Sequence, residues 1–331
     1  MARDSGTRRL DRRTFAKVAG GAAIAGLAGC VGGPAGAGDE GSGGQQFVTI
    51  GTGGTGGVYY PLGGGMADVL NENMDGVEAS AESTGASVEN CRLVADEEMT
   101  MALALGNSVL LAVDGEGDFD EPLPLAALFG AYQNSTQVIT LENTDIESIA
   151  DMEGRKVSVG SPGSGTEVIA KELLEFYDLT YDDIDEQRLS FGETASALKD
   201  GQIDAGFWSV AYPASSIQDL ASQRNIRMLD FPAEDLDELT SEFDYYVKGT
   251  VPAETYQGQD EDVNVPDVTN SMVAREDMGE DLAYEVVKTI YENVDALVEV
   301  HPAAEQFEET ARDAPIDLHP GARKYFDEAD L

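Results

Sequence analysis

A glycine-rich loop between a strand and a helix constrains this chain more than any other segment. Residues 47–61 read Phe-Val-Thr-Ile-Gly-Thr-Gly-Gly-Thr-Gly-Gly-Val-Tyr-Tyr-Pro, in which an apolar strand precedes five glycines in seven positions. Glycines let a backbone turn sharply and approach a ligand closely. A helix is expected to open near Val58, and the first amides of a helix lack intrahelical partners at the positive end of its dipole. The loop therefore predicts a site for an anionic group.

The N-terminal segment is predicted to direct export and tethering. A twin-arginine pattern at residues 12–13 precedes the apolar run Val18–Ala28, which is too short for a permanent membrane span. The residues before Cys30 resemble a bacterial-type lipobox, in which the cysteine receives lipid and becomes the mature N-terminus. We expect residues 1–29 to be a twin-arginine lipoprotein signal and residues 30–46 a flexible tether, on the extracytoplasmic face of the cell membrane. The alternatives are an uncleaved anchor or a chance cysteine.

The charge of the chain is strongly acidic. The formal net charge is −43, and because residues 1–29 hold six basic and two acidic residues, the rest carries a net of −47. With 42% hydrophobic residues, the chain is globular rather than disordered. An acidic surface suits a protein of molar salt, where the Debye length is about 3 Å, and indicates a salt-adapted prokaryote of archaeal type. Nucleic-acid binding is excluded as a function class, because phosphates need a basic footprint; a mesophile with cationic partners is the alternative.

Beyond the tether, strand and helix patterns alternate along two similar units. This alternation predicts an α/β fold with parallel sheets and helices on both faces, and the length of about 285 residues allows two domains. Residues 108–113 are expected to form a strand, and Pro124–Leu141 is expected to cross between the domains. Thr166 is expected to cap a helix over 166–177, and a later helix is expected over 194–199.

Two catalytic interpretations of the loops were weighed against simple binding. Gly51–Gly56 satisfies the dinucleotide pattern G-x-G-x-x-G after a strand, but the loop continues into an aromatic pair that a cofactor loop does not need. Residues 160–166 approach a phosphate loop, but its lysine is missing. No Cys/His cluster for a metal and no G-x-S-x-G nucleophile elbow occur in the sequence. No cofactor and no metal are expected.

Four loops of glycine and small hydroxyl residues follow strands, at 52–57, 83–87, 160–166 and 208–209. Such loops bind through neutral donors and helix dipoles. Each alone reads as an ordinary turn between a strand and a helix, but four of them, two in each unit, predict a shared binding cleft.

With these motifs the chain resembles the TAXI subgroup of solute receptors, which serve TRAP-type transporters. The resemblance spans residues 47–325 and rests on residues 50–61, 83–88, 159–167, 198–205 and 318–322. It implies a two-lobed periplasmic-binding-protein fold (type II-like) with the ligand cleft between the lobes. Lobe I would comprise residues 47–135 plus 250–331, and lobe II residues 136–249.

The resemblance also implies the ligand-binding residues. The first wall of the cleft would take Thr52, Gly53, Gly54, Thr55, Gly56, Tyr59, Ser83, Thr84, Gly85 and Ser87, and the second Ser161, Ser164, Gly165 and Thr166. Tyr132 and Trp208 would pack against the carbon skeleton of the solute, unless they are an interface aromatic and a core tryptophan. Receptors of the sister TRAP subgroup hold dicarboxylates with an arginine clamp, but here Arg155, Arg188 and Arg224 lie in no ligand loop, so amides and hydroxyls are expected to hold the carboxylate.

The predicted function is that of a receptor rather than an enzyme. It would bind a small carboxylate or amino-acid solute, such as glutamate, and deliver it to TRAP-type membrane permease subunits. Two alternatives remain open at this point: an exported oxidoreductase that uses the Gly51–Gly56 loop for a dinucleotide, and a receptor of the same fold that serves an ABC importer or a sensor.

Overall fold

A computed structural model of the protein describes residues 45–331. These residues belong to one compact unit that begins at Gly43. The predicted signal, the lipid attachment at Cys30 and most of the predicted tether lie outside the described residues, so those predictions stay predictions.

Within residues 45–331, ten strands form one mixed sheet, in the order β2-β1-β3-β10-β4-β7-β5-β6, with β8 on β4 and β9 on β10. Their bounds are β1 Gln46–Gly51, β2 Val77–Glu82, β3 Met101–Leu105, β4 Leu125–Leu141, β5 Lys156–Ser158, β6 Asp185–Gln187, β7 Ala205–Val210, β8 Ile226–Met228, β9 Tyr246–Val251 and β10 Val263–Arg275.

The helices follow the strands in both halves of the sheet. Their bounds are α1 Tyr59–Asn73, α2 Ser87–Ala95, α3 Gly106–Asp114, α4 Gly165–Phe176, α5 Phe191–Lys199, α6 Ser215–Ala221, α7 Ala233–Glu242, α8 Glu280–Tyr291, α9 Val294–Val300, α10 Phe307–Thr310 and α11 Pro320–Ala329. Short 3-10 turns lie at η1 Ile149–Met152, η2 Tyr181–Asp183 and η3 Pro302–Gln306.

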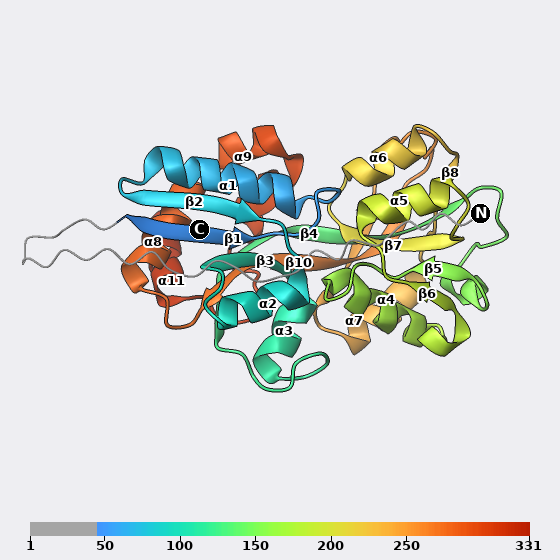
Figure 1. The fold of residues 1–331 in the computed structure, drawn as a ribbon, viewed down its shortest axis with the longest axis horizontal. Helices are drawn as coiled ribbons and strands as arrows, with labels where there is room; N and C mark the ends of the chain where they lie inside the picture. Colours follow the sequence, from blue (N-terminus) through green and yellow to red (C-terminus); the bar gives the residue numbers. More distant parts are fainter. Residues whose placement is uncertain (1–44) are drawn as a thin grey trace, which may run out of the picture. The chain divides into compact units, whose positions relative to one another are not determined.

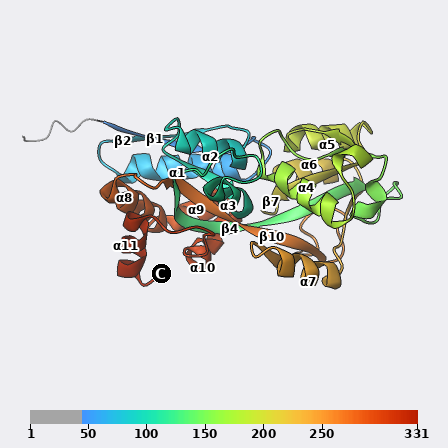
Figure 2. The same cartoon turned by 90° about the horizontal axis from the view of Figure 1, so that it is seen from below.

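Two long strands join the halves of the sheet and correct the expectation of purely parallel sheets. The strands β1, β2 and β3 pair in parallel in the first half, and β5, β6 and β7 do so in the second. Between them β4 and β10 pair antiparallel with each other, and each pairs antiparallel with its other neighbours. We call β4 and β10 the connecting strands; Figure 2 shows both running from one half into the other.

Helices cover both faces of the sheet in each half, as the sequence predicts. In Figure 1, α1 and α9 lie on one side of β1 and β2, with α2 and α3 on the other, and α5 and α6 lie opposite α4 and α7 around β7. Helix α1 buries Leu62, Met66 and Leu70, whose spacing of four puts them on one face. This arrangement brings the carboxyl ends of β1, β2, β5 and β7, and the helices that follow them, to the middle of the unit.

The expected strand over residues 108–113 is wrong, because this segment lies in α3. Val109 and Ala112 are buried at a spacing of three, which is a helical spacing, and Gly115 ends the helix in the left-handed region with φ of 69°. A short apolar run is compatible with either a buried strand or a buried helix, so periodicity alone did not distinguish them.

Candidate functional site

A small pocket lies where the loops of the two halves meet. We call the β1–α1 and β2–α2 loops the first wall. The second wall consists of the loop at residues 159–164, Ser190 just before α5, and Ser209 and Val210 at the end of β7. The pocket is lined by Gly53, Gly54, Gly57, Val58, Tyr59, Gly85, Ala86, Ser87, Asn134, Ser161, Ser164, Gly165, Thr166, Ser190, Phe191, Ser209 and Val210. Its volume is about 50 Å³, below the roughly 300–1,000 Å³ of common ligand sites, so the walls enclose space for only a compact group.

Four helices begin at this pocket. Tyr59, Ser87, Gly165 and Phe191 are the first residues of α1, α2, α4 and α5, and all four line it. The helices have 15, 9, 12 and 9 residues, so each carries several turns of aligned peptide dipoles. The N-terminal ends of helices favour negative charge. Four such ends around one cavity would favour an anionic group there.

Backbone amides of these first turns remain available to a ligand. Ser87, Gly165, Thr166 and Phe191 have N–H groups without an acceptor among residues 45–331. By contrast, the amides of Val88 and Glu89 both donate across the pocket to the carbonyl of Gly163, over 3.1 and 3.2 Å. The Gly163 carbonyl therefore links the first wall to the second, and we call this pair of bonds the clasp.

The hydroxyl groups of the second wall divide into structural and available ones. Ser164 is the N-cap of α4 and accepts from the amide of Glu167 over 3.2 Å, so the expectation that Thr166 caps this helix is wrong. Thr166 is instead the second residue of the helix, 3% exposed, and its hydroxyl makes no hydrogen bond within the described part of the chain. Together with Ser161, it can donate to a ligand.

Asn134 contributes a polar acceptor that the sequence analysis missed. It lies on β4, is 3% exposed and lines the pocket. Its Nδ2 donates to the carbonyl of Ser209 over 3.0 Å, which leaves Oδ1 without a partner among residues 45–331. A buried acceptor without a hydrogen bond lowers the stability of the fold, so the pocket would favour a ligand that carries a hydrogen-bond donor.

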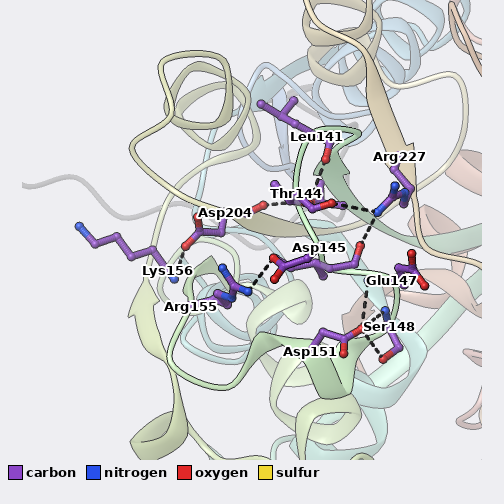
Figure 3. Close-up of polar contacts among 12 residues, drawn as sticks. Leu141, Thr144, Asp145, Glu147, Ser148, Asp151, Arg155, Lys156, Asp204 and Arg227 are labelled. Carbon is purple, nitrogen blue, oxygen red and sulfur yellow. Dashed lines mark hydrogen bonds and ion pairs between the residues drawn. The ribbon is translucent and has the colours of Figure 1, made fainter.

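Charged side chains are absent from the lining, as far as residues 45–331 show. The arginines considered as clamps act elsewhere: Arg155 pairs with Asp145 at 2.6 Å, Arg188 pairs with Glu167 at 2.6 Å, and Arg224 donates to the carbonyl of Lys199. Figure 3 shows Arg155 in the network around residues 141–156, 204 and 227. Recognition of an anion therefore rests on amides, hydroxyls and helix dipoles.

Several predicted residues shape the first wall without lining the pocket. Thr52 is buried and donates to the carbonyl of Glu82 over 2.6 Å, while Ser83 and Thr84 donate to the carbonyls of Gly53 and Thr52, both over 2.9 Å. These bonds tie the β1–α1 loop to the β2–α2 loop. Thr55 is exposed at the rim of the wall, and the Gly56 carbonyl accepts from Ser215 over 3.5 Å.

The two predicted aromatic residues, Tyr132 and Trp208, lie behind residues of the pocket lining and do not line the pocket themselves. Tyr132 is fully buried and lies edge-on to Tyr59, with ring centroids 6.5 Å apart. Trp208 is fully buried and stacks on Phe191 at 6.2 Å. Burial raises the pKa of Tyr59 well above its usual value, so its hydroxyl stays protonated and donates to Asn270. Tyr59 and Phe191 are thus the aromatic groups that a solute would touch.

Ser190 and Phe191 were missed because the helix of the second unit was expected to begin at residue 194. It begins at Phe191, and Ser190 caps it through a reciprocal bond with Glu193. A Ser followed three residues later by Glu is the sequence signature of such a capping box, and it would have located this helix start.

Residues 45–331 hold no group of three His, Cys, Asp or Glu side chains arranged to bind a metal ion, and none of their helices is long and apolar enough to cross a membrane. Cys91 is buried, with a thiol pKa that burial raises to about 12. That thiol is an inert core group rather than a nucleophile.

Comparison with known proteins identifies the family. The model of the NMT1-like family matches residues 50–329, which is most of the sequence. The chain belongs to the NMT1-like family. The matched range of this NMT1-like protein includes every loop that lines the pocket.

Solved structures share the fold of this NMT1-like protein at low sequence identity. One, from work on glutathione import through GshT and the cystine ABC importer TcyBC of Streptococcus mutans, is 13% identical, covers 81% of this chain and 96% of that chain, and has a TM-score of 0.50. A second is a putative L-cystine ABC transporter from Listeria monocytogenes, which is 14% identical, covers 81% of this chain and 99% of that chain, and has a TM-score of 0.49. A third is the periplasmic aliphatic sulphonate binding protein SsuA from Escherichia coli, which is 14% identical, covers 85% of this chain and 83% of that chain, and has a TM-score of 0.48. The predicted α/β two-lobed periplasmic-binding-protein fold is confirmed.

Proposed function

We propose that this NMT1-like protein is a solute receptor of a TRAP-type secondary transporter of the TAXI subgroup. It binds a small carboxylate, such as glutamate or a related acid, and delivers it to membrane permease subunits. The observation that carries the proposal is the meeting of four helix N-termini at one pocket whose lining, within residues 45–331, holds no charged side chain. Hydrogen bonds to a charged acceptor are shorter and stronger than neutral ones, so amides and hydroxyls suffice for a carboxylate.

Asn134 narrows the chemistry of the solute. Its unpartnered Oδ1 favours a solute that donates a hydrogen bond, such as an amino acid through its amino group or a hydroxy acid through its hydroxyl group. Glutarate has the two carboxylates of glutamate and lacks the amino group. A preference for glutamate over glutarate would therefore report on Asn134.

The two lobes would open to admit the solute and close on it. Lobe I comprises residues 47–135 and lobe II begins at residue 136, because β4 changes partners near Ser135, from β10 to β7. The chain passes back from lobe II to lobe I along β10. We propose that this second crossing lies near Asp267 rather than at residue 250, since β9 and the start of β10 pack beside lobe II. The twin-arginine signal, the lipid anchor at Cys30 and the extracytoplasmic location belong to the same proposal.

A receptor that serves an ABC importer is the second candidate. It is favoured by the similar solved structure from Streptococcus mutans, which comes from work on glutathione import through a cystine ABC importer. The neighbouring genes discriminate the two: a large multi-spanning permease supports the TRAP assignment, and an ATPase with a smaller permease supports the ABC assignment. The dinucleotide alternative is disfavoured because the pocket, with a volume of about 50 Å³, would have to open much farther for a dinucleotide than for a small acid.

The direct test is thermal unfolding of the protein in high-salt buffer with a panel of carboxylates, amino acids and nucleotides. A ligand at about 100 times its Kd adds roughly 2.7 kcal/mol to the free energy of unfolding, which raises the midpoint visibly. A rise with glutamate or a related acid supports the receptor. A panel in which only a dinucleotide raises the midpoint, or in which nothing does, contradicts it.

The Asn134→Leu variant tests the proposed donor contact. Leu keeps the branching of the side chain and removes the acceptor, together with the Nδ2 bond to Ser209, so the ratio of the glutamate and glutarate affinities should fall toward one. An unchanged ratio of the two affinities would show that Asn134 does not accept a hydrogen bond from the amino group of glutamate.

A further inference from the structure

The connecting strands carry a polar cluster on the face opposite the pocket, formed by Gln133, Ser135 and Asp267. Successive side chains of a strand point to opposite faces, so Gln133 and Ser135 point away from the pocket that Asn134 lines. Ser135 is the direct register partner of Asp267 on β10, and Gln133 is the partner of Thr269. These residues lie where β4 changes its partner, at the crossing between the lobes.

Three oxygen atoms of this polar cluster have no partner among residues 45–331: Asp267 Oδ1, Ser135 Oγ and Gln133 Oε1. The free atom of Gln133 is its carbonyl oxygen, because Nε2 donates to Thr269 Oγ1 over 2.9 Å. Asp267 is 9% exposed and Ser135 is 1% exposed. The Asp267 and Gln133 oxygens are therefore buried acceptors, and the Ser135 hydroxyl can accept as well as donate. The three groups come from two strands that belong to both lobes.

The carboxylate of Asp267 is the unusual member of this group. No ion pair formed within residues 45–331 includes it. An unpaired buried carboxylate is expensive, and burial raises the pKa of Asp267 to about 7 despite the nearby Ser135 hydroxyl. The fold nevertheless makes room for it: a Cβ on Gly249 of β9 would collide with the carboxylate of Asp267.

We propose that Asp267, Ser135 and Gln133 bind a monovalent alkali cation, Na⁺ or K⁺, at the crossing between the lobes. The site offers only oxygen ligands, which suit hard cations. It supplies one formal negative charge, whereas calcium sites gather several carboxylates. The bound cation bridges the connecting strands and neutralises the carboxylate, whatever solute the pocket takes.

The test compares unfolding midpoints in NaCl, KCl and choline chloride at equal ionic strength and at pH 8, so that general screening is constant and Asp267 is ionised. We expect the midpoint to be several degrees higher in NaCl or KCl than in choline chloride. Asp267→Asn and Ser135→Ala should each remove most of this difference. The control Asp68→Asn should keep it, since Asp68 is exposed on α1 and makes no ion pair or hydrogen bond within residues 45–331.

The proposal is overturned by equal midpoints of the unmodified protein in all three chlorides, or by a cation difference that survives in Asp267→Asn. A midpoint that follows pH through 7 and ignores the identity of the cation would also overturn it, because the carboxylate would then be neutralised by a proton alone. If a variant fails to fold, crystals of the unmodified protein soaked in RbCl decide the question. An anomalous peak between Asp267 and Ser135 supports the site, and its absence at saturating Rb⁺ refutes it.

Discussion

Gly165→Ala should prevent the two walls from closing on a solute. Gly165 begins α4, and a Cβ there would lie 2.5 Å from Leu105 Cδ1 and 2.8 Å from Ser87 Oγ, both in lobe I. Ordinary contact begins near 3.4 Å, so the walls would have to stand roughly 1 Å farther apart. That displacement breaks the clasp, whose two bonds are 3.1 and 3.2 Å long.

The expected loss follows from the clasp. A hydrogen bond contributes about 0.5–1.5 kcal/mol net, so losing two weakens the closed complex by about 1–3 kcal/mol. This corresponds to a Kd about 5 to 150 times higher. The free energy of unfolding without solute should change little, because the added methyl group meets solvent when the walls separate.

The assay is a titration with the acid that the unfolding panel identifies, and binding is monitored through the fluorescence of Trp208. This is the only tryptophan of the chain, and it stacks on Phe191 in the pocket lining. Gly192→Ala is the matched control, since it adds the same methyl group in the first turn of α5, with nothing within 4 Å. If Gly165→Ala binds as tightly as Gly192→Ala, closure through this contact is refuted.

Three further predictions concern single groups. Thr166→Val keeps the shape of the side chain and removes its hydroxyl, so the affinity for the acid should fall by about 1–3 kcal/mol in calorimetric titrations, with an unchanged urea midpoint; equal affinity would remove Thr166 from the site. Ser190→Ala should lower the free energy of urea unfolding by about 0.5–2 kcal/mol through the lost cap of α5, and no loss would contradict the capping geometry. Burial raises the pKa of Asp267 to about 7, above that of an unfolded aspartate, and Tyr212 is the titratable neighbour that interacts with it. In choline chloride, the free energy of unfolding should therefore fall as the pH rises from about 4 to about 7 and then level off, by at most about 1.4 kcal/mol per pH unit, and Asp267→Asn should flatten this part of the profile.

The sequence was sufficient to predict the loops of the site, because their composition has a local cause. Glycines and small hydroxyl residues between a strand and a helix mark a close approach of backbone to ligand, and Gly53, Ser87, Gly165 and Thr166 do line the pocket. The same local logic applies to Ser190, whose capping signature was overlooked. The position of a helix start is encoded in a few adjacent residues.

The connecting strands and Asn134 depend on contacts between distant segments, which the sequence does not reveal. Strand β10 contains Asn264, Pro266, Asp267 and Asn270, which interrupt the apolar pattern expected of a buried central strand. Asn134 lies in the middle of β4, where no local signal separates a ligand contact from a core amide. Only the pairing of β4 with β10 and β7 brings Asn134 to the pocket and brings the polar cluster together on the opposite face.

A crystal structure of the protein with the identified acid is the most direct test of the central claim that helix N-termini hold the solute. The account predicts a carboxylate oxygen about 2.7–3.2 Å from the amides of Gly165 and Thr166, with Ser87 or Phe191 donating from another helix start. A solute bound outside this pocket, or a carboxylate held by an arginine or lysine side chain, would contradict it.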